Sequence, residues 1–110
     1  MAHIPGGYEA ELDPQRRAAE QAMRAGQRAE GVRREAREAQ RSAADSLDRS
    51  AESQERTARA YEKAAEHTDR GDEYREYAAR HREFAEEDRR MAQELRQMAE
   101  SDSMGNPAIP

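Results

Sequence analysis

A seven-residue repeat runs through residues 72–100 and restricts this chain to helical architectures. One set of repeat positions is Tyr74, His81, Asp88 and Leu95, and the next is Tyr77, Phe84, Met91 and Met98. A third set, beside them, consists of Ala78, Ala85, Ala92 and Ala99. Apolar positions with this spacing line one side of an α-helix, so they predict packing of this helix against another one.

Signals for the start and end of helices divide the chain into two such elements. Asp13 and Pro14 suit the N-cap and the first position of a helix, and no proline follows before Arg70. Gly71 and Asp72 suit a helix end followed by a new N-cap. We therefore expect one domain, 13–100, with a helix at 14–70, a turn at 71 and a helix at 72–100. We expect flexible segments at 1–12 and 101–110, where Gly and Pro are frequent.

If the chain reverses at Gly71, facing residues have numbers that sum to 142. This register places Ala58 opposite Phe84 and Ala51 opposite Met91, so that a small side chain faces a large one. Polar and aromatic residues then also face each other across the two helices. The register-setting layer that we predict pairs Gln54 with Asp88 and Tyr61 with His81.

The predicted fold class is all-α: an antiparallel helical hairpin, or coiled coil, with a long first helix. In this register Glu100 faces Ser42, so residues 14–41 have no partner in the second helix. An alternative is a three-helix bundle with a break near residue 42, where Ser42 and Asp45 resemble a capping box. No Gly or Pro interrupts residues 41–43, which favours the long helix.

The composition argues against an enzyme. There is no Cys, and neither a nucleophile elbow nor a phosphate-binding loop is present. Residues three positions before His67 and His81 are alanines, so the Glu-x-x-His pattern of di-iron bundles is missing. We expect no catalytic, cofactor or metal site and no small-molecule substrate. No apolar run approaches the roughly 20 residues of a membrane span, and no signal peptide is recognisable, so we expect no membrane association and a cytoplasmic location.

Residues 14–41 carry the features expected of a binding segment. A small-residue stripe with alternating spacings of four and three runs through Ala18, Ala22, Ala25, Ala29, Val32, Ala36 and Ala39. Eight Arg accompany four Glu here, and the candidate contact residues among them are Arg33, Arg34, Arg37 and Arg41. An alanine stripe buries little area on its own. We therefore predict a homodimer, or a protein partner that supplies larger side chains.

Two alternatives involve the same helix. The Arg-rich segment 16–41 could contact nucleic-acid phosphates, although it has no aromatic residue for base stacking. Five hydroxyl side chains at helical spacing form a candidate modification stripe, which we interpret as small-residue packing. These residues are Ser42, Ser46, Ser50, Ser53 and Thr57.

The stretch from Ala58 to Arg96, ARAYEKAAEHTDRGDEYREYAARHREFAEEDRRMAQELR, resembles Ala-rich helical-hairpin segments of uncharacterised actinobacterial proteins. The shared pattern combines aromatic or His positions with paired alanines, a Gly turn and a returning His-Arg-x-x-Ala helix. It covers about a third of the chain. The resemblance implies a role in interaction or regulation.

Overall fold

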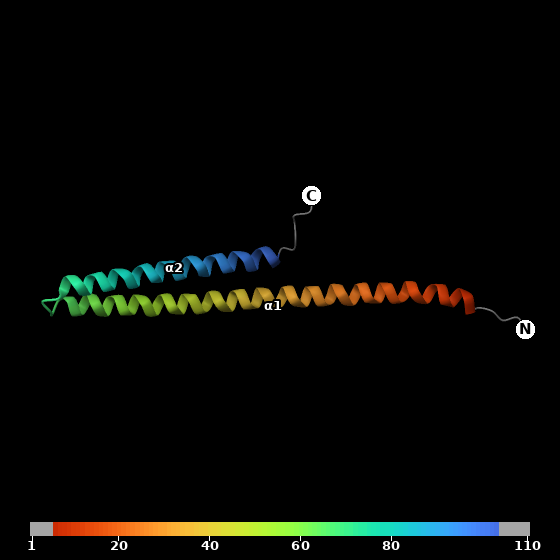
Figure 1. Ribbon diagram of the computed structural model, residues 1–110, viewed down its shortest axis with the longest axis horizontal. Coiled ribbons are helices and arrows are strands. Elements are labelled where there is room, and N and C mark those ends of the chain that lie inside the picture. The colour runs from red at the N-terminus through yellow and green to blue at the C-terminus, as the bar shows by residue number, and fades with distance from the viewer. Residues whose placement is uncertain (1–5, 104–110) are drawn as a thin grey trace, which may run out of the picture. The chain divides into compact units, whose positions relative to one another are not determined.

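The computed structural model describes residues 6–103. It consists of two α-helices, α1 (Gly6–Ala65) and α2 (Gly71–Ser103), and contains no strand in the described range. Residues up to Glu35 form one unit, and residues from Ala36 onward form a second. In the second unit α2 runs back antiparallel along α1 (Figure 1). The predicted all-α antiparallel helical hairpin is confirmed.

The first helix has no break at residues 41–43, so the three-helix alternative with a break near residue 42 is not found. Alanine, Glu and Arg, which dominate this stretch, all have high helix propensity. α1 begins at Gly6, inside the segment that we expected to be flexible, and passes through Pro14. Residues 1–5 of that segment lie outside the described residues, as do residues 104–110 of the expected flexible tail.

The connection between the helices occupies residues 66–70, before Gly71. α1 ends at Ala65, and its last turn tightens because the N–H of His67 donates to the carbonyl of Ala64 at 3.0 Å. The hydroxyl of Thr68 accepts a hydrogen bond from the N–H of Arg70 at 3.2 Å. Gly71 is therefore the first residue of α2 and not the turn itself.

A close backbone approach explains the glycine at this position. Gly71 is buried, and a Cβ atom placed on it would lie 2.9 Å from the carbonyl oxygen of Ala65. Real Cβ atoms do not approach a backbone oxygen so closely. Glycine thus allows α2 to begin directly against the end of α1.

We expect Gly71→Ala to lower the free energy of unfolding of the hairpin by about 1–2 kcal/mol, because steric strain outweighs the gain in helix propensity. Gly26→Ala is the matched control. A Cβ at Gly26 meets nothing within 4 Å, so only the propensity gain of about 1 kcal/mol remains. Urea unfolding followed by circular dichroism measures both. Equal effects of the two variants would contradict the close approach.

The core between the helices consists of alanines. Four on each helix are at most 4% exposed: Ala44, Ala51, Ala58 and Ala65 on α1, and Ala78, Ala85, Ala92 and Ala99 on α2. In chain-reversed order their numbers pair to a sum of 143, one residue from the predicted register. A methyl group at each contact allows two helix backbones to approach closely, as small residues do at tight helix crossings.

The expected packing of small against large side chains is wrong. Phe84, Met91 and Met98 are 49%, 44% and 51% exposed. The alanines that directly follow Tyr77, Phe84, Met91 and Met98 along α2 occupy the interface instead. A large side chain in this position would hold the backbones apart, so the large residues lie beside the contact.

Candidate protein interaction surface

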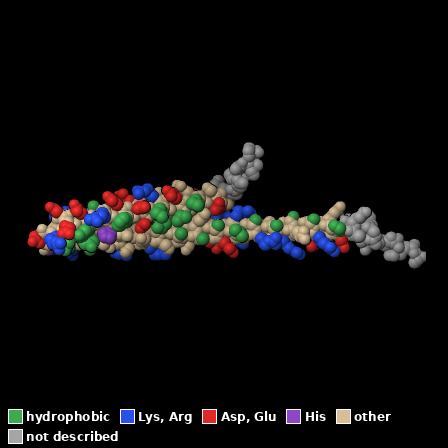
Figure 2. Space-filling model, viewed as in Figure 1, with side chains coloured by type: hydrophobic (Ala, Val, Ile, Leu, Met, Phe, Trp, Pro, Cys, Tyr) green, Lys and Arg blue, Asp and Glu red, His purple; other side chains and the backbone are tan. Residues whose placement is uncertain are grey.

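The large apolar side chains of α2 lie together on one face of the hairpin. We call Tyr77, Phe84, Met91 and Met98 the apolar row of α2. The same face of α1 carries the heptad set that we call the small row: Ala43, Ser50, Thr57 and Ala64. Figure 2 shows hydrophobic side chains exposed along the hairpin with charged groups on either side. This face therefore has a ridge of large residues on α2 and a strip of small ones on α1. Half-buried side chains lie between the two rows: Leu47, Gln54, Tyr61, His81, Asp88 and Leu95.

Aromatic contacts near the turn place Tyr61, the helical neighbour of Thr57 and Ala64 in the small row, on the same side of the interface as the apolar row. The ring centroid of Tyr61 on α1 lies 5.7 Å from that of Tyr74 and 5.4 Å from that of Tyr77. The guanidinium carbon of Arg80 lies 5.2 Å from the Tyr77 ring centroid, within cation–π range. Phe84 continues the cluster, with its ring centroid 6.1 Å from that of His81. These rings form a partly exposed platform.

The predicted pair of Tyr61 and His81 is present as a stack, with ring centroids 5.7 Å apart and an interplanar angle of 16°. Gln54, which we expected opposite Asp88, bonds to His81 instead. The two atoms, Nδ1 of His81 and Oε1 of Gln54, are 2.5 Å apart. Because an amide oxygen only accepts, Nδ1 is the donor. Asp88 is half-buried, one heptad further along α2.

A hollow of about 180 Å³ lies beside this stack. Its walls are Tyr61, Tyr77, Arg80, His81 and Phe84. Four of these are aromatic rings and one is a cation, and none is a carboxylate. The hollow thus offers aromatic surface to an apolar side chain and no carboxylate to a metal ion.

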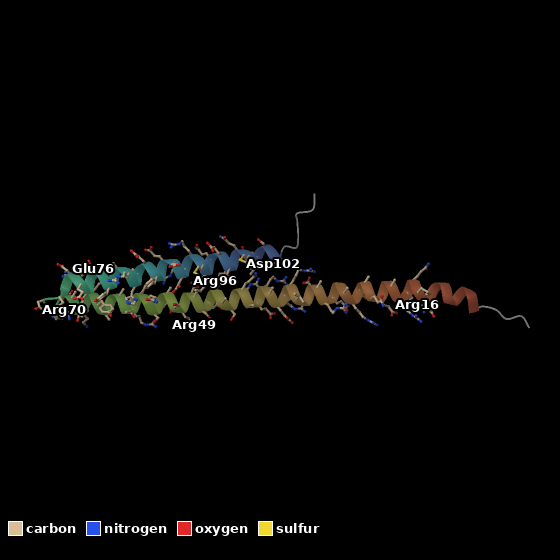
Figure 3. The ribbon with its side chains drawn as sticks, in the orientation of Figure 1. Arg16, Arg49, Arg70, Glu76, Arg96 and Asp102 are labelled. Atoms are coloured by element: carbon tan, nitrogen blue, oxygen red, sulfur yellow. The ribbon has the colours of Figure 1, made fainter. Side chains whose placement is uncertain are left out.

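The opposite side of the alanine interface carries ion pairs at the same seven-residue spacing. Nε and Nη2 of Arg82 donate to one oxygen of Glu62 at 2.8 and 2.5 Å. Arg89 pairs with Glu55. Arg96 lies 2.9 Å from Asp45 and 2.7 Å from Asp48, and Figure 3 shows it between the helices. Exposed ion pairs stabilise weakly, but their common spacing specifies one alignment of the helices.

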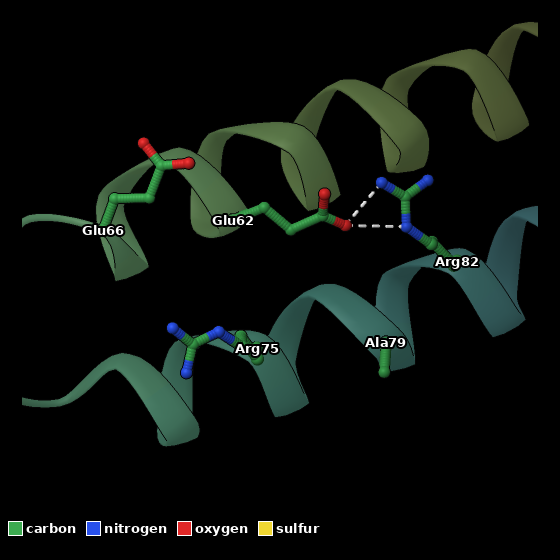
Figure 4. A pocket seen from close by; sticks show the side chains of 5 residues that line it. All are labelled: Glu62, Glu66, Arg75, Ala79 and Arg82. Atoms are coloured by element: carbon green, nitrogen blue, oxygen red, sulfur yellow. Dashed lines mark hydrogen bonds and ion pairs between the residues drawn. The ribbon is translucent and has the colours of Figure 1, made fainter.

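A second, larger hollow of about 480 Å³ lies on this charged side, lined by Glu62, Glu66, Arg75, Ala79 and Arg82 (Figure 4). Two carboxylates and two guanidinium groups balance each other there. Arg82 is engaged by Glu62, and Arg75 lies 3.0 Å from Asp72. A charged ligand would have to break these pairs, so we do not assign a binding role to this hollow.

Ion pairing gives the hairpin a pH dependence. The hydrogen bond from Arg89 holds the pKa of Glu55 below its usual value of 4.5. A depressed folded-state pKa stabilises above the unfolded value and is lost as the pH falls through the folded value. We expect the stability difference between wild type and Glu55→Gln to shrink as the pH falls below 4.5, in thermal melts by circular dichroism. A difference that does not change with pH would contradict this linkage.

The residues predicted to bind a partner lie in both units. Those up to Arg34 belong to the first unit, where the described side chains from Asp13 to Glu30 are all exposed and Val32 is 65% exposed. Ala36 and Arg37 belong to the hairpin unit and are half-buried, whereas Ala39 and Arg41 are exposed. The Arg37 guanidinium donates to the carbonyl of Asp102 at 3.4 Å.

The arginines of segment 16–41 do not form one basic face. Residues 17 and 24 share one heptad position and residue 28 lies beside them, whereas residues 16, 33 and 34 occupy three other positions, so the arginines point to more than one side of the helix. Arg24 lies 3.9 Å from Glu20, and Arg33 lies 3.0 Å from Glu30. This arrangement gives no continuous track for a phosphate backbone.

Sequence reasoning did not identify the apolar row as an exposed surface. The signal that was available is the unbroken heptad of alanines directly after it, Ala78 to Ala99. If those alanines form the interface, the preceding residues must lie on its edge. Size complementarity within one chain was the more intuitive assignment, but it leaves the alanines without a role.

Among residues 13–102, no cluster of three or more His, Asp or Glu side chains is suited to hold a metal ion. Neither described helix contains a stretch long and apolar enough to cross a membrane. No protein-family model, curated protein or solved structure matches this chain. The resemblance of residues 58–96 to Ala-rich helical hairpins therefore stays an expectation.

Proposed function

We propose that this chain is a non-enzymatic interaction protein that acts by self-association or protein docking through small-residue and apolar faces of its helices. The observation that carries the proposal is the exposure of Phe84, Met91 and Met98 at a spacing of seven residues on one face. A contiguous apolar strip rimmed by charges is the usual sign of a protein–protein contact. The cytoplasmic location expected from the sequence is part of the same proposal.

The small apolar area buried in the core supports this proposal. Eight alanines form the buried core, and no large side chain in the described residues is fully buried. At about 0.8 kcal/mol per buried methyl-sized group, they contribute only about 6 kcal/mol. Helices owe most of their stability to packing of an apolar face. Covering the apolar row would supply the burial that the hairpin lacks.

Light scattering across a dilution series tests the proposal. We expect a mass above the 12.5 kDa of one chain at high concentration that falls on dilution. The melting temperature should rise with concentration, because association stabilises the folded state by mass action. A mass of 12.5 kDa at every concentration, with a constant melting temperature, would contradict self-association.

A nucleic-acid-associated role, the alternative for segment 16–41, gains no support from the distribution of its arginines. If it were correct, binding would be detectable at low salt and would weaken steeply as salt is added. We expect no binding of duplex DNA or single-stranded RNA to the full chain in 50 mM salt, measured by fluorescence anisotropy. Salt-sensitive binding would reinstate the alternative.

A further inference from the structure

We propose that the apolar face of the hairpin is covered by the same face of a second copy, related by a two-fold axis parallel to the helices. This inference rests on the proposed function and names its partner and geometry. The product is a four-helix arrangement in which α2 of each copy lies against α1 of the other. Three properties of the face select this arrangement: the level of its side chains, its area and the charge of its edges.

The levels of the side chains match across such a contact. Within the hairpin, a residue of α1 and a residue of α2 lie at the same height along the helix axis, which we call a level, when their numbers sum to 143. The buried alanine pairs Ala58/Ala85 and Ala51/Ala92 show this relation. A two-fold axis parallel to the helices leaves these levels unchanged. Phe84 then lies level with position 59 of the second copy, between Thr57 and Ala60. By the same rule Met91 lies level with position 52 of the second copy, between Ser50 and Ser53.

Phe84, Met91 and Met98 therefore each meet a gap between small side chains. Met98 lies level with position 45 of the second copy, between Ala43 and Ser46. This is the knobs-into-holes relation of packed helices, and it recurs because both rows repeat every seven residues. The contact is also isologous, because the apolar row of each copy packs into the gaps of the small row of the other copy.

The area is sufficient for a stable dimer. α2 has 33 residues, which corresponds to about 50 Å of helix. Two helices placed side by side at 8–10 Å present a face about 20 Å wide. Each copy thus buries roughly 800–1,000 Å², the size of a stable specific interface.

Charge at the edges of the face distinguishes this axis from the other two-fold choice. The outer edge of α1 carries Arg49, Arg56 and Lys63, and Figure 3 shows Arg49 on the side of α1 away from α2. The outer edge of α2 is mainly acidic, with four glutamates and two arginines: Glu76, Glu83, Glu87, Glu94, Arg80 and Arg90.

A two-fold axis parallel to the helices brings unlike edges together. Arg56 of one copy is level with Glu87 of the other, and Arg49 is level with Glu94, because both pairs sum to 143. A two-fold axis perpendicular to the helices would place α1 against α1 and bring the basic edges together. Like charges across an interface are unfavourable, so the parallel axis is selected.

Charge reversal with rescue tests the pairing. The variants Arg49→Glu/Arg56→Glu and Glu87→Arg/Glu94→Arg alter only exposed side chains, so circular dichroism should show unchanged helicity. We expect each variant alone to dimerise at least about tenfold more weakly than wild type, by light scattering. Their equimolar mixture, and the quadruple variant, should regain the wild-type dissociation constant. Failure of both to recover would overturn the proposed pairing.

Distance measurement tests the axis. Because the chain has no cysteine, Asp69→Cys in the turn accepts a single spin label. The parallel axis places both turns at one end of the dimer, about 20 Å apart, whereas the perpendicular axis separates them by about 50 Å. A dimer with the long distance overturns this inference and leaves the proposed function standing. A chain that stays monomeric, so that another protein is the occupant, overturns both this inference and self-association.

Discussion

Replacing Ala85 with leucine lowers the free energy of unfolding of the hairpin by at least about 2 kcal/mol, according to the packing described above. Ala85 is 1% exposed and lies in the middle of the alanine interface. Three additional carbon atoms cannot enter a backbone contact of this kind without moving the helices apart. Overpacking of a filled interior usually costs about 1–3 kcal/mol, and here the displacement also weakens the neighbouring contacts at Ala78 and Ala92.

The control for this substitution is Ala79→Leu. Ala79 lies on the same helix but is exposed. Alanine and leucine differ little in helix propensity, so the control isolates the packing effect and should change stability by less than about 0.5 kcal/mol. For a domain of this size, 2 kcal/mol lowers the melting temperature by about 10 °C. Equal melting temperatures at one protein concentration would show that Ala85 is not a tight contact.

The hairpin itself was predictable because its signals are local and repetitive. The heptad in residues 72–100 and the reversal near Gly71 define two antiparallel helices, and the predicted register differs from the observed one by a single residue. The stack of Tyr61 on His81 follows directly from that register. Repetition makes such an alignment robust, since every pair of facing residues supports the same sum.

The assignment of the core was not predictable by the same reasoning. Two adjacent heptad sets on α2 qualify as an interface, one of large residues and one of alanines, and they differ by only one position. Maximal burial of apolar area favours the large set. The structure uses the alanines, because Ala44 to Ala65 on α1 are small too and two small surfaces approach closely. Choosing between the sets requires the distance between the helices, which no single-helix pattern contains.

The same ambiguity between two heptad sets is the reason why the apolar row was not predicted as an exposed surface. Sequence reasoning placed the partner-binding stripe at Ala18 to Ala39, whereas the structure leaves Phe84, Met91 and Met98 exposed as well. The partner of Gln54 differs from the prediction for a related reason. Gln54 is long enough to reach His81, and a side chain of that reach is not confined to the residue at its own level. Positions are predictable from periodicity, but the direction of a long polar side chain is not.

Placing a carboxylate in the apolar row separates an interaction surface from incidental exposure. We expect Met91→Glu to weaken self-association at least about 100-fold, which corresponds to about 2.7 kcal/mol. In a two-fold dimer the substitution introduces two buried charges. Each would lie between Ser50 and Ser53 of the other copy, where there is no opposite charge. Desolvation of an unpaired carboxylate costs several kcal/mol, so this magnitude is conservative.

The matched control is Gln93→Glu, which adds the same charge two residues further along α2. Gln93 is exposed and shares its heptad position with Ala79, which lines the hollow on the ion-paired side. Its effect on the dissociation constant should stay within about threefold, as light scattering across the same dilution series would measure. If both variants weakened association equally, net charge rather than this face would be the cause. If neither did, the contact would have to lie elsewhere, and the small-residue stripe from Ala18 to Val32 would be the next surface to alter.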